Sequence, residues 1–443
     1  MAKGRAIGRF EAALGIVGIV ALAVTYSLMT GWNPLPGTRD KVDSWLAKTV
    51  SVSRPAPAWA KRVGGQPSTA AVAGHAVILV MRGTVEAHDA GDGSLLWSRD
   101  ADWGAVAGAG ADTVAVLGHH GHGYDVVSPA SGTVRWSDTS AVGTWTYRDA
   151  ILSLSCPALS DCTLTARTPG DGSVRWKSTL PGIGRVLAGV NVPLLGSRPV
   201  ATDYRPVAAT PGDLPALLGF PVDQRVTVVD TATGHRLAQQ TPSGTTRVVV
   251  VGGRVLRSTA SPRGGNCRYS LTAVDPASGR TVWQRDGYDL GTASGAGCEQ
   301  RRDPGGGGDA LAAIRGDNRP VFLSARDGRE LWTGGSGDTI LATDGRYGAV
   351  RTADHKLAVI DLGTGGTAWT AGLDPHASVA VTRNAVLVTS AAIGRLAALE
   401  PGSGRTLVNV ESTATVLGVG ADGLVVGRGR TIGYVTFGTV GTG

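Results

Sequence analysis

The chain has 443 residues, including 66 glycines; 42% of the residues are hydrophobic and 17% are charged. So much apolar material excludes an intrinsically disordered chain, and the many glycines among valines and threonines favour short strands and tight turns over long helices. The net charge of +7 comes mainly from arginines spread thinly along the chain, without a basic stripe of stacking aromatics, so we expect no nucleic-acid binding. Weak attraction to anionic lipid head groups or wall polymers is the milder interpretation of this charge.

The first predicted element is a transmembrane helix at residues 11–30. Ala12 to Met29 form an 18-residue apolar run, which is just long enough to cross a bilayer. Three basic residues precede the run, so the positive-inside rule keeps residues 1–10 in the cytoplasm and sends the rest of the chain outside. These basic residues are Lys3, Arg5 and Arg9.

A cleaved signal peptide is the alternative interpretation of the same segment. Ala21-Leu22-Ala23 resembles a small-residue cleavage site after an apolar stretch. Because the hydrophobicity continues to Met29, the length of the run favours an uncleaved anchor. No cysteine follows the apolar run, which argues against a lipid-modified anchor. Both alternatives place the rest of the chain on the extracytoplasmic side of the cell membrane.

A juxtamembrane linker is predicted at residues 31–58. Trp32 and the two prolines that follow it are typical of a helix ending at head-group depth. Asp40 to Val50 has apolar residues at helical spacing, which is typical either of a short amphipathic turn on the membrane or of a plain spacer. A proline-rich stretch closes the linker, and a folded domain is predicted at residues 59–438.

One sequence motif, called the phrase below, recurs along this domain. It consists of an alternating strand, an acidic or polar residue, a turn ending in Gly, three further residues, and Trp. The alternation turns one strand face inward, the polar side chain bonds its own turn, and Gly supplies a positive φ. Trp begins the next strand, and we expect its ring to fill the wedge between adjacent sheets. The phrase ends in Trp at Trp97, Trp136, Trp176, Trp283, Trp332 and Trp369, and two further copies lack the Trp.

The period of this phrase predicts the fold class. Its glycines lie at positions 93, 132, 172, 234, 279, 328, 365 and 404, so most are about 40 residues apart. That period is typical of the four-stranded blade of a β-propeller. After the last phrase there are three strands without a fourth, and Trp59 to Val63 is predicted to supply it. The two ends of the domain would then close the ring and remove its exposed sheet edges.

The blade number is less well defined by the sequence. Eight phrases plus a closing blade give nine, whereas seven or eight blades are the ordinary expectation. Residues 185–223 are irregular and rich in proline, so this fourth unit is not expected to supply a full blade. We predict an all-β propeller of about eight four-stranded blades, with seven or nine as alternatives.

The phrase resembles the pyrroloquinoline-quinone-like (PQQ-like) propeller repeat of quinoprotein dehydrogenases and BamB-like assembly factors. The matching segments are Asp89 to Trp97, Asp275 to Trp283 and Ala325 to Trp332, and the resemblance extends from Trp59 to Phe437. It implies a membrane-anchored bacterial propeller and says little about activity, because one fold carries many functions. The chain lacks the lipid-modified anchor of the BamB-like pattern, so an outer-membrane assembly role is not expected.

Catalytic motifs do not accompany the repeat. Quinoprotein dehydrogenases carry adjacent cysteines over the cofactor and acidic or Asn calcium ligands in the channel, and this sequence has no adjacent cysteines. Nor does it contain a nucleophile elbow, a phosphate-binding loop or a zinc-protease helix. We therefore expect no enzymatic activity and no PQQ or calcium. The alternative is a propeller that binds a small molecule or a PQQ-like cofactor, in its extreme form an oxidoreductase relic.

The four cysteines are predicted to form disulfides, because their number is even and the domain is expected outside the reducing cytosol. Cys156 and Cys162 flank a turn in the third unit. Cys267 and Cys298 belong to adjacent units and would pair by elimination, which requires the loop with Cys298 to fold back. Free buried thiols are the alternative.

Two further clusters have the composition of possible sites. His119, His120 and His122 are weak metal candidates, because no Cys or carboxylate lies at a diagnostic spacing and a solvated hairpin loop explains them equally well. Arg315-Gly316-Asp317 mimics an adhesion tripeptide but is also typical of a tight turn between strands.

Together these features predict a non-enzymatic, membrane-tethered extracytoplasmic interaction platform. Its partner is expected to be an unidentified envelope protein or cell-wall polymer, bound by the propeller face or by the long loops at residues 190–223 and 287–309. Clustered carboxylates, Asn or Arg on the inner strands of the ring would instead favour the cofactor-binding alternative.

Overall fold

The computed structural model describes residues 57–157, 161–181, 200–201, 208–209, 211–222, 225–237, 240–241, 243–291, 298, 306–390 and 393–438. The chain divides into two compact units, Met1–Ser51 and Val52–Gly443, and all the described residues belong to the second. Within them, no helix has the length and hydropathy that a membrane crossing requires. The predicted transmembrane helix and nearly all of the predicted linker lie outside the described residues.

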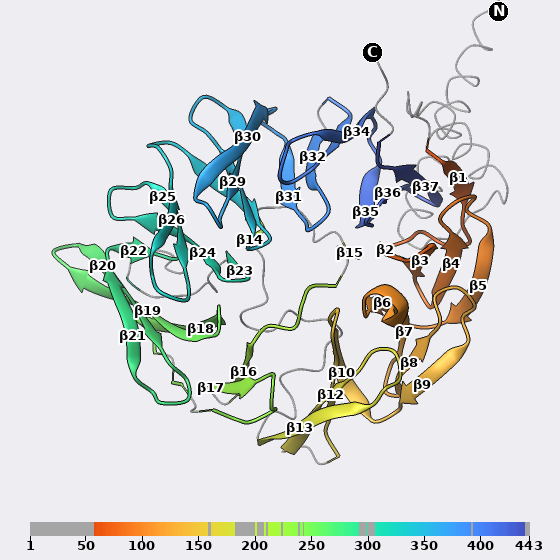
Figure 1. Ribbon diagram of the computed structural model, residues 1–443, viewed down its shortest axis with the longest axis horizontal. Coiled ribbons are helices and arrows are strands. Elements are labelled where there is room, and N and C mark those ends of the chain that lie inside the picture. Colours follow the sequence, from red (N-terminus) through yellow and green to blue (C-terminus); the bar gives the residue numbers. More distant parts are fainter. Residues whose placement is uncertain are drawn as a thin grey trace, which may run out of the picture. The chain divides into compact units, whose positions relative to one another are not determined.

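The second unit is all-β, as its glycine and valine content predicts. Apart from one short 3-10 helix, Gly110–Asp112, the elements of its described part are strands, and these form nine sheets. In Figure 1 the sheets follow one another around a ring, and in blades such as β6 to β9 the strands run in chain order from the centre outward. We number the sheets as blades 1 to 9 in chain order, and in each blade we call the strand on the central side inner and the strand at the opposite edge outer.

Blades 1 to 3 each consist of four antiparallel strands. Blade 1 contains β2 (Thr69–Ala73), β3 (Ala76–Met81), β4 (Thr84–Asp89) and β5 (Leu95–Asp100). Blade 2 contains β6 (Trp103–Ala107), β7 (Val114–His119), β8 (Gly123–Val127) and β9 (Val134–Asp138). Blade 3 contains β10 (Ala141–Thr146), β11 (Ile151–Ser155), β12 (Asp161–Arg167) and β13 (Val174–Pro181).

Blades 5 to 8 repeat this order. Blade 5 contains β18 (Thr246–Val251), β19 (Arg254–Arg263), β20 (Asn266–Val274) and β21 (Thr281–Asp286). Blade 6 contains β22 (Tyr288–Asp289), β23 (Gly306–Gly307), β24 (Ala310–Arg315), β25 (Pro320–Ser324) and β26 (Glu330–Thr333). Blade 7 contains β27 (Thr339–Thr343), β28 (Tyr347–Arg351), β29 (Lys356–Asp361) and β30 (Gly366–Gly372). Blade 8 contains β31 (Ser378–Val381), β32 (Val386–Ser390), β33 (Arg395–Leu399) and β34 (Thr406–Glu411).

Blade 9 closes the ring. It contains β35 (Thr415–Val419), β36 (Gly423–Arg428), β37 (Thr431–Thr436) and, as its outer strand, β1 (Trp59–Arg62) from the other end of the domain. The pairing of β1 with β37 is antiparallel and runs from Trp59 opposite Tyr434 to Arg62 opposite Thr431. Figure 1 shows the two ends meeting at this blade. The closure predicted from the missing fourth strand is therefore present.

Blade 4 is reduced. It contains two strands, β16 (Leu217–Val222) and β17 (Arg225–Asp230), and two isolated bridges stand where the other blades have an outer strand. Two short strands that precede it, β14 (Val200–Ala201) and β15 (Ala208–Ala209), pair with the inner strands β27 and β35 of other blades. The described residues therefore form eight full blades, the number predicted, and one reduced blade in the irregular fourth unit.

Tryptophans connect neighbouring blades through one repeated contact. The indole N–H of each donates to the backbone carbonyl that lies three residues before the turn glycine of the next blade, at 2.6 to 3.1 Å. The donor and acceptor pairs are Trp59 and Ala90, Trp97 and Pro129, Trp136 and Pro169, Trp176 and Thr231, Trp283 and Ala325, and Trp369 and Pro401. The phrase thus specifies the docking of one blade on the next.

Two features of these turns require glycine: a positive φ and the close contact with the indole ring. At the glycines beneath these six rings φ lies between 68° and 75°, a region that residues with a Cβ rarely adopt. A Cβ built at each of them would lie 2.5 to 2.8 Å from the indole, which is far inside van der Waals contact. These glycines are Gly93, Gly132, Gly172, Gly234, Gly328 and Gly404.

Trp332 departs from this pattern. Its ring lies 5.9 Å from Phe322 of its own blade, and the turn glycine of the next blade, Gly365, lies under the carbonyl of Leu331 instead. The residue at the acceptor position of that turn is Leu362, whose buried side chain occupies the same apolar cluster as Trp332. A bulky aliphatic side chain therefore stands where the other turns have Pro, Ala or Thr.

This difference gives a matched pair of substitutions. Trp97→Phe is expected to lower the free energy of unfolding by about 1 kcal/mol, because the carbonyl of Pro129 loses its indole donor. Trp332→Phe removes no bond of this kind among the described residues and is expected to cost clearly less. Chemical denaturation followed by circular dichroism measures both values. Equal losses would show that the indole hydrogen bond is not what distinguishes the two positions.

Candidate interaction surface

The hairpin of β19 and β20 is the most extended hairpin of the described chain. Its strands have 10 and 9 residues, more than any other described strand, and they pair as far as Arg263 opposite Asn266. The turn consists of Gly264 and Gly265, both with positive φ, which is the two-residue connection that such a turn requires. The hairpin projects at the left of Figure 1, beyond the neighbouring blades.

The two faces of this hairpin differ in chemistry because side chains alternate along a strand. Leu256, Leu271 and Ala273 on one face are buried in the core shared by blades 5 and 6. On the opposite face, every side chain from Arg257 to the turn and back to Arg268 is polar. We call this surface the arginine face; it consists of Arg257, Thr259, Ser261, Arg263, Asn266 and Arg268.

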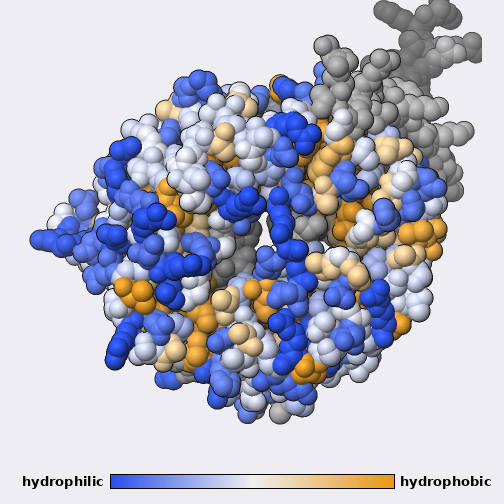
Figure 2. Space-filling view, in the orientation of Figure 1, coloured by the Kyte–Doolittle hydropathy of each residue, from blue (hydrophilic) through white to orange (hydrophobic). Residues whose placement is uncertain are grey.

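The guanidinium groups of the arginine face are accessible. Arg257, Arg263 and Arg268 are all exposed, and the protruding hairpin is hydrophilic in Figure 2. At the end of the arginine face away from the turn, Arg257 donates from Nε and Nη2 to the buried Gln240 side-chain oxygen at 3.1 and 2.5 Å. Among the described residues, no carboxylate forms an ion pair with Arg263 or Arg268. Within the described chain, the tip therefore carries two exposed arginines that have no carboxylate partner.

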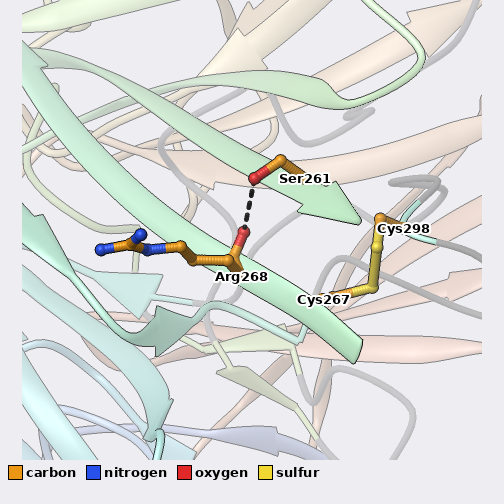
Figure 3. The surroundings of a disulfide bond; sticks show 4 residues. All are labelled: Ser261, Cys267, Arg268 and Cys298. Carbon is orange, nitrogen blue, oxygen red and sulfur yellow. Dashed lines mark hydrogen bonds between the residues drawn. A yellow bond between two sulfur atoms is a disulfide. The ribbon is translucent and has the colours of Figure 1, made fainter. Parts of the chain in front are cut away.

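A disulfide braces the tip from the other face. Cys267 is bonded to Cys298, with their Cα atoms 5.5 Å apart, so the pairing expected by elimination is present. Figure 3 shows the disulfide and the Arg268 side chain on opposite sides of β20. The Ser261 hydroxyl donates to the Arg268 carbonyl at 3.4 Å. The second predicted disulfide, between Cys156 and Cys162, is also present.

Two comparable turns on the same side of the ring, those of blades 6 and 7, pair a basic side chain with a carboxylate of the same turn. Arg315 donates to both carboxylate oxygens of Asp317, and these bonds lower the pKa of Asp317 to about 2. Lys356 lies 2.6 Å from Asp354, and its hydrogen bond lowers the pKa of that carboxyl to about 2. The Arg315-Gly316-Asp317 tripeptide is therefore internally paired, which agrees with its interpretation as a turn.

The inner strands carry few groups that could hold a cofactor. Along the described inner strands, Arg247 and Asp289 are the only charged residues. The short strands β14 and β15 pair with the backbones of the inner strands β27 and β35. A calcium-bound quinone requires several acidic or amide ligands, and this set of side chains does not fit one. These strands thus lack the clustered carboxylates that would favour the cofactor-binding alternative.

The histidine cluster does not assemble a metal site in the described chain. The imidazole of His119 lies 3.3 Å from an oxygen of Asp125, and the backbone N–H of His120 donates to Asp102 at 2.6 Å. No group of three or more potential metal ligands occurs within the described residues. The carboxylate beside His119 is six residues away in sequence and comes from the opposite strand of the hairpin.

A buried polar network joins blades 2 and 3. Asp138 accepts hydrogen bonds from the Ser140 and Ser153 hydroxyls at 2.7 and 3.0 Å, and Arg167 lies 3.4 Å away. Burial acts to raise the pKa of Asp138, but these hydrogen bonds and the Arg167 charge outweigh it and lower the pKa below its usual value. Ionised Asp138 therefore stabilises the contact between the two blades.

Replacement of Asp138 by Asn is expected to lower the free energy of unfolding by about 1–2 kcal/mol at neutral pH. Because the pKa of Asp138 is depressed in the folded state, its contribution is fully present above the unfolded value of about 3.9 and is lost as the pH falls through the folded pKa. The difference in unfolding free energy between wild type and variant should therefore shrink below pH about 4. A difference that stays constant to lower pH would contradict this.

The arginine face was not among the sites predicted from the sequence. The prediction placed recognition in the loops at residues 190–223 and 287–309, which for the most part lie outside the described residues. The signal was present in the alternation around Gly264-Gly265, where one set of alternate residues is polar throughout and the other contains apolar residues and Cys267. Only the strand register shows that the polar set lies on one face.

Comparison with known proteins supports the repeat assignment. Residues 268–419 match the family model described as outer membrane protein assembly factor BamB, a span of less than half of the chain. The match begins within β20 and ends at the last residue of β35, and it confirms the predicted PQQ-like, BamB-like propeller repeat. No curated protein matches this chain in sequence.

Two solved structures resemble this chain at low sequence identity. BamB from Moraxella catarrhalis is 18% identical, with a TM-score of 0.37, over 76% of this chain and 96% of that one. The quinohemoprotein alcohol dehydrogenase ADHIIG from Pseudomonas putida HK5 is 12% identical, with a TM-score of 0.40, over 87% of this chain and 77% of that one. At this level of similarity we draw no conclusion from either.

Proposed function

Starting from a propeller chain whose residues 268–419 carry the BamB-like, PQQ-like repeat, we propose that it is a non-enzymatic interaction platform held at the outer face of the cytoplasmic membrane. The closed ring is a rigid scaffold, and loops on such scaffolds carry recognition. The observation that supports the proposal most is the β19–β20 hairpin, which projects from the ring with an exposed polar face and a disulfide at its tip.

The placement outside the cytosol has two independent supports. Both disulfides use all four cysteines of the chain, and structural disulfides persist in oxidising compartments. The apolar run from Ala12 to Met29, preceded by basic residues, has the length and charge pattern of an anchor with its N-terminus inside. The partner in this proposal is an envelope protein or a cell-wall polymer.

Affinity capture with the full chain tests this function. The chain, solubilised in detergent, is incubated with envelope extract in parallel with a variant in which Arg263 and Arg268 are both replaced by Glu. A partner recovered in stoichiometric amount by the wild type and reduced with the variant would support a platform that uses the hairpin. Recovery of no stable partner, together with a stoichiometric quinone or calcium ion in the purified protein, would overturn the proposal in favour of a cofactor-binding propeller.

A further inference from the structure

We propose that the arginine face binds an extended acidic segment of a partner protein. This inference rests on the platform function proposed above and specifies one docking surface and the chemistry of its occupant. The whole hairpin, residues 254–274, contains four arginines and no Asp or Glu. Charge complementarity therefore requires an anionic occupant.

The spacing of the charges favours an extended ligand over a compact one. Arg257 and Arg263 are six residues apart on one strand, so their Cα atoms are separated by roughly 20 Å at the rise of a β-strand. Arg268 lies on the same face of the adjacent strand, diagonally opposite Arg263. A ligand that contacts all three guanidinium groups must itself be long and must carry more than one negative charge.

The exposed guanidinium groups have donors available for such a ligand. Guanidinium binds carboxylates through two parallel hydrogen bonds, and a Lys ammonium has no equivalent geometry. Neither Arg263 nor Arg268 has a carboxylate partner in the described chain, whereas Arg315 and Lys356 in comparable turns do. Within the described chain, the hairpin tip thus lacks the internal ion pairs that these two turns form.

The neighbouring side chains favour a polypeptide occupant. The Asn266 amide can both donate and accept hydrogen bonds, as a peptide backbone does, and the Ser261 oxygen can accept one beside its bond to the Arg268 carbonyl. The Thr259 hydroxyl is paired with that of Thr246. Aromatic rings, on which sugar rings stack, are not among the residues of the arginine face; Tyr269 lies in the alternate set with Cys267. Arginine is enriched at protein interfaces and their energetic centres.

The hairpin is also paired along its whole length and crosslinked near its tip. Cys267 ties one side of the tip to Cys298, and the pairing of β19 with β20 continues to the turn. A preordered surface loses less conformational entropy when it binds, so more of the interaction energy appears as affinity.

Fluorescence anisotropy with a labelled peptide of ten glutamates tests the inference on the full chain in detergent. The variant Arg263→Glu/Arg268→Glu is compared with the control Arg280→Glu/Arg329→Glu, which changes the net charge by the same amount. The two control arginines are exposed and lie in the β20–β21 and β25–β26 turns, on the side of the ring opposite to the hairpin tip. We expect the hairpin variant to bind at least tenfold more weakly than wild type and the control variant to stay within about twofold, a difference of about 1 kcal/mol or more. Unchanged thermal midpoints confirm that both variants are folded.

The outcomes separate this inference from the platform function. Equal loss in both variants would show that the peptide responds only to the overall positive charge, and the inference would be wrong even if envelope capture succeeds. A polyphosphate probe that binds the hairpin more tightly than the glutamate peptide would assign the surface to an anionic polymer and overturn the protein segment. Loss confined to the hairpin variant, with preference for the glutamate peptide, supports the inference whether or not capture has identified a natural partner.

Discussion

Gly132→Ala is expected to lower the free energy of unfolding by about 2–4 kcal/mol, whereas Gly279→Ala costs only about 1 kcal/mol. Both glycines end the same tetrapeptide, Pro-Ala-Ser-Gly, and their φ values are 68° and 69°. A Cβ at Gly132 would lie 2.7 Å from the ring of Trp97, but a Cβ at Gly279 would meet nothing within 4 Å. Alanine would therefore strain the backbone equally at both positions, but it would clash with an indole ring only at Gly132.

The physical reason lies in the preceding blade. Gly279 follows the reduced blade 4, whose phrase lacks the tryptophan that docks on the next turn in other blades. The double variant Trp97→Ala/Gly132→Ala isolates the clash, because the cost of Gly132→Ala in the Trp97→Ala background should fall to that of Gly279→Ala. Denaturant midpoints for the set give these values. Equal costs at the two glycines in the wild-type background would show that the indole contact does not constrain the turn.

Removal of the disulfide at the hairpin tip is expected to have the second large effect. Cys267→Ser/Cys298→Ser opens a loop with a sequence separation of 31, and chain entropy predicts a loss of about 3–4 kcal/mol. Cys156→Ser/Cys162→Ser opens a loop with a separation of 6 and should cost about 2 kcal/mol. The larger loss is expected for the longer loop because the unfolded chain gains more freedom there.

Denaturation without reductant compares both double variants with the wild type. Limited proteolysis adds a local readout, since the hairpin variant should be cut near Gly264-Gly265 while the rest of the ring resists. A hairpin variant that is as stable as, or more stable than, the Cys156 variant would contradict the assignment of Cys267–Cys298 as the dominant brace.

The fold was predictable because one short phrase encodes three things at once. Its Gly sets the turn, its alternation sets the strand faces, and its Trp sets the contact with the next blade, as the Trp97 and Pro129 bond shows. Ring closure followed from a missing fourth strand, which β1 supplies. The phrase did not predict that Trp59 would make the same contact, with Ala90, because no strand-Gly unit precedes it.

The rest was less predictable for physical reasons. Trp332 fits the phrase, yet the side chain of Leu362 in the next turn displaces the usual contact, and this depends on packing between segments 30 residues apart in sequence. The pairing of β14 and β15 with distant inner strands leaves no periodic signal, because each strand has two residues. The arginine face was hidden because exposed alternating residues are also typical of an ordinary solvated strand.

Crosslinking of the ring seam tests the central claim most directly. Arg62 and Thr431 are paired residues of β1 and β37, so Arg62→Cys/Thr431→Cys should form a disulfide on mild oxidation, visible as a crosslinked peptide in a nonreducing digest. Arg62→Cys/Thr415→Cys is the control, since Thr415 begins the inner strand of the same blade, two strands away from β37. A crosslink in the first variant with free thiols in the second is the result that closure predicts. Free thiols in both, with the native disulfides intact, would contradict a ring closed by β1.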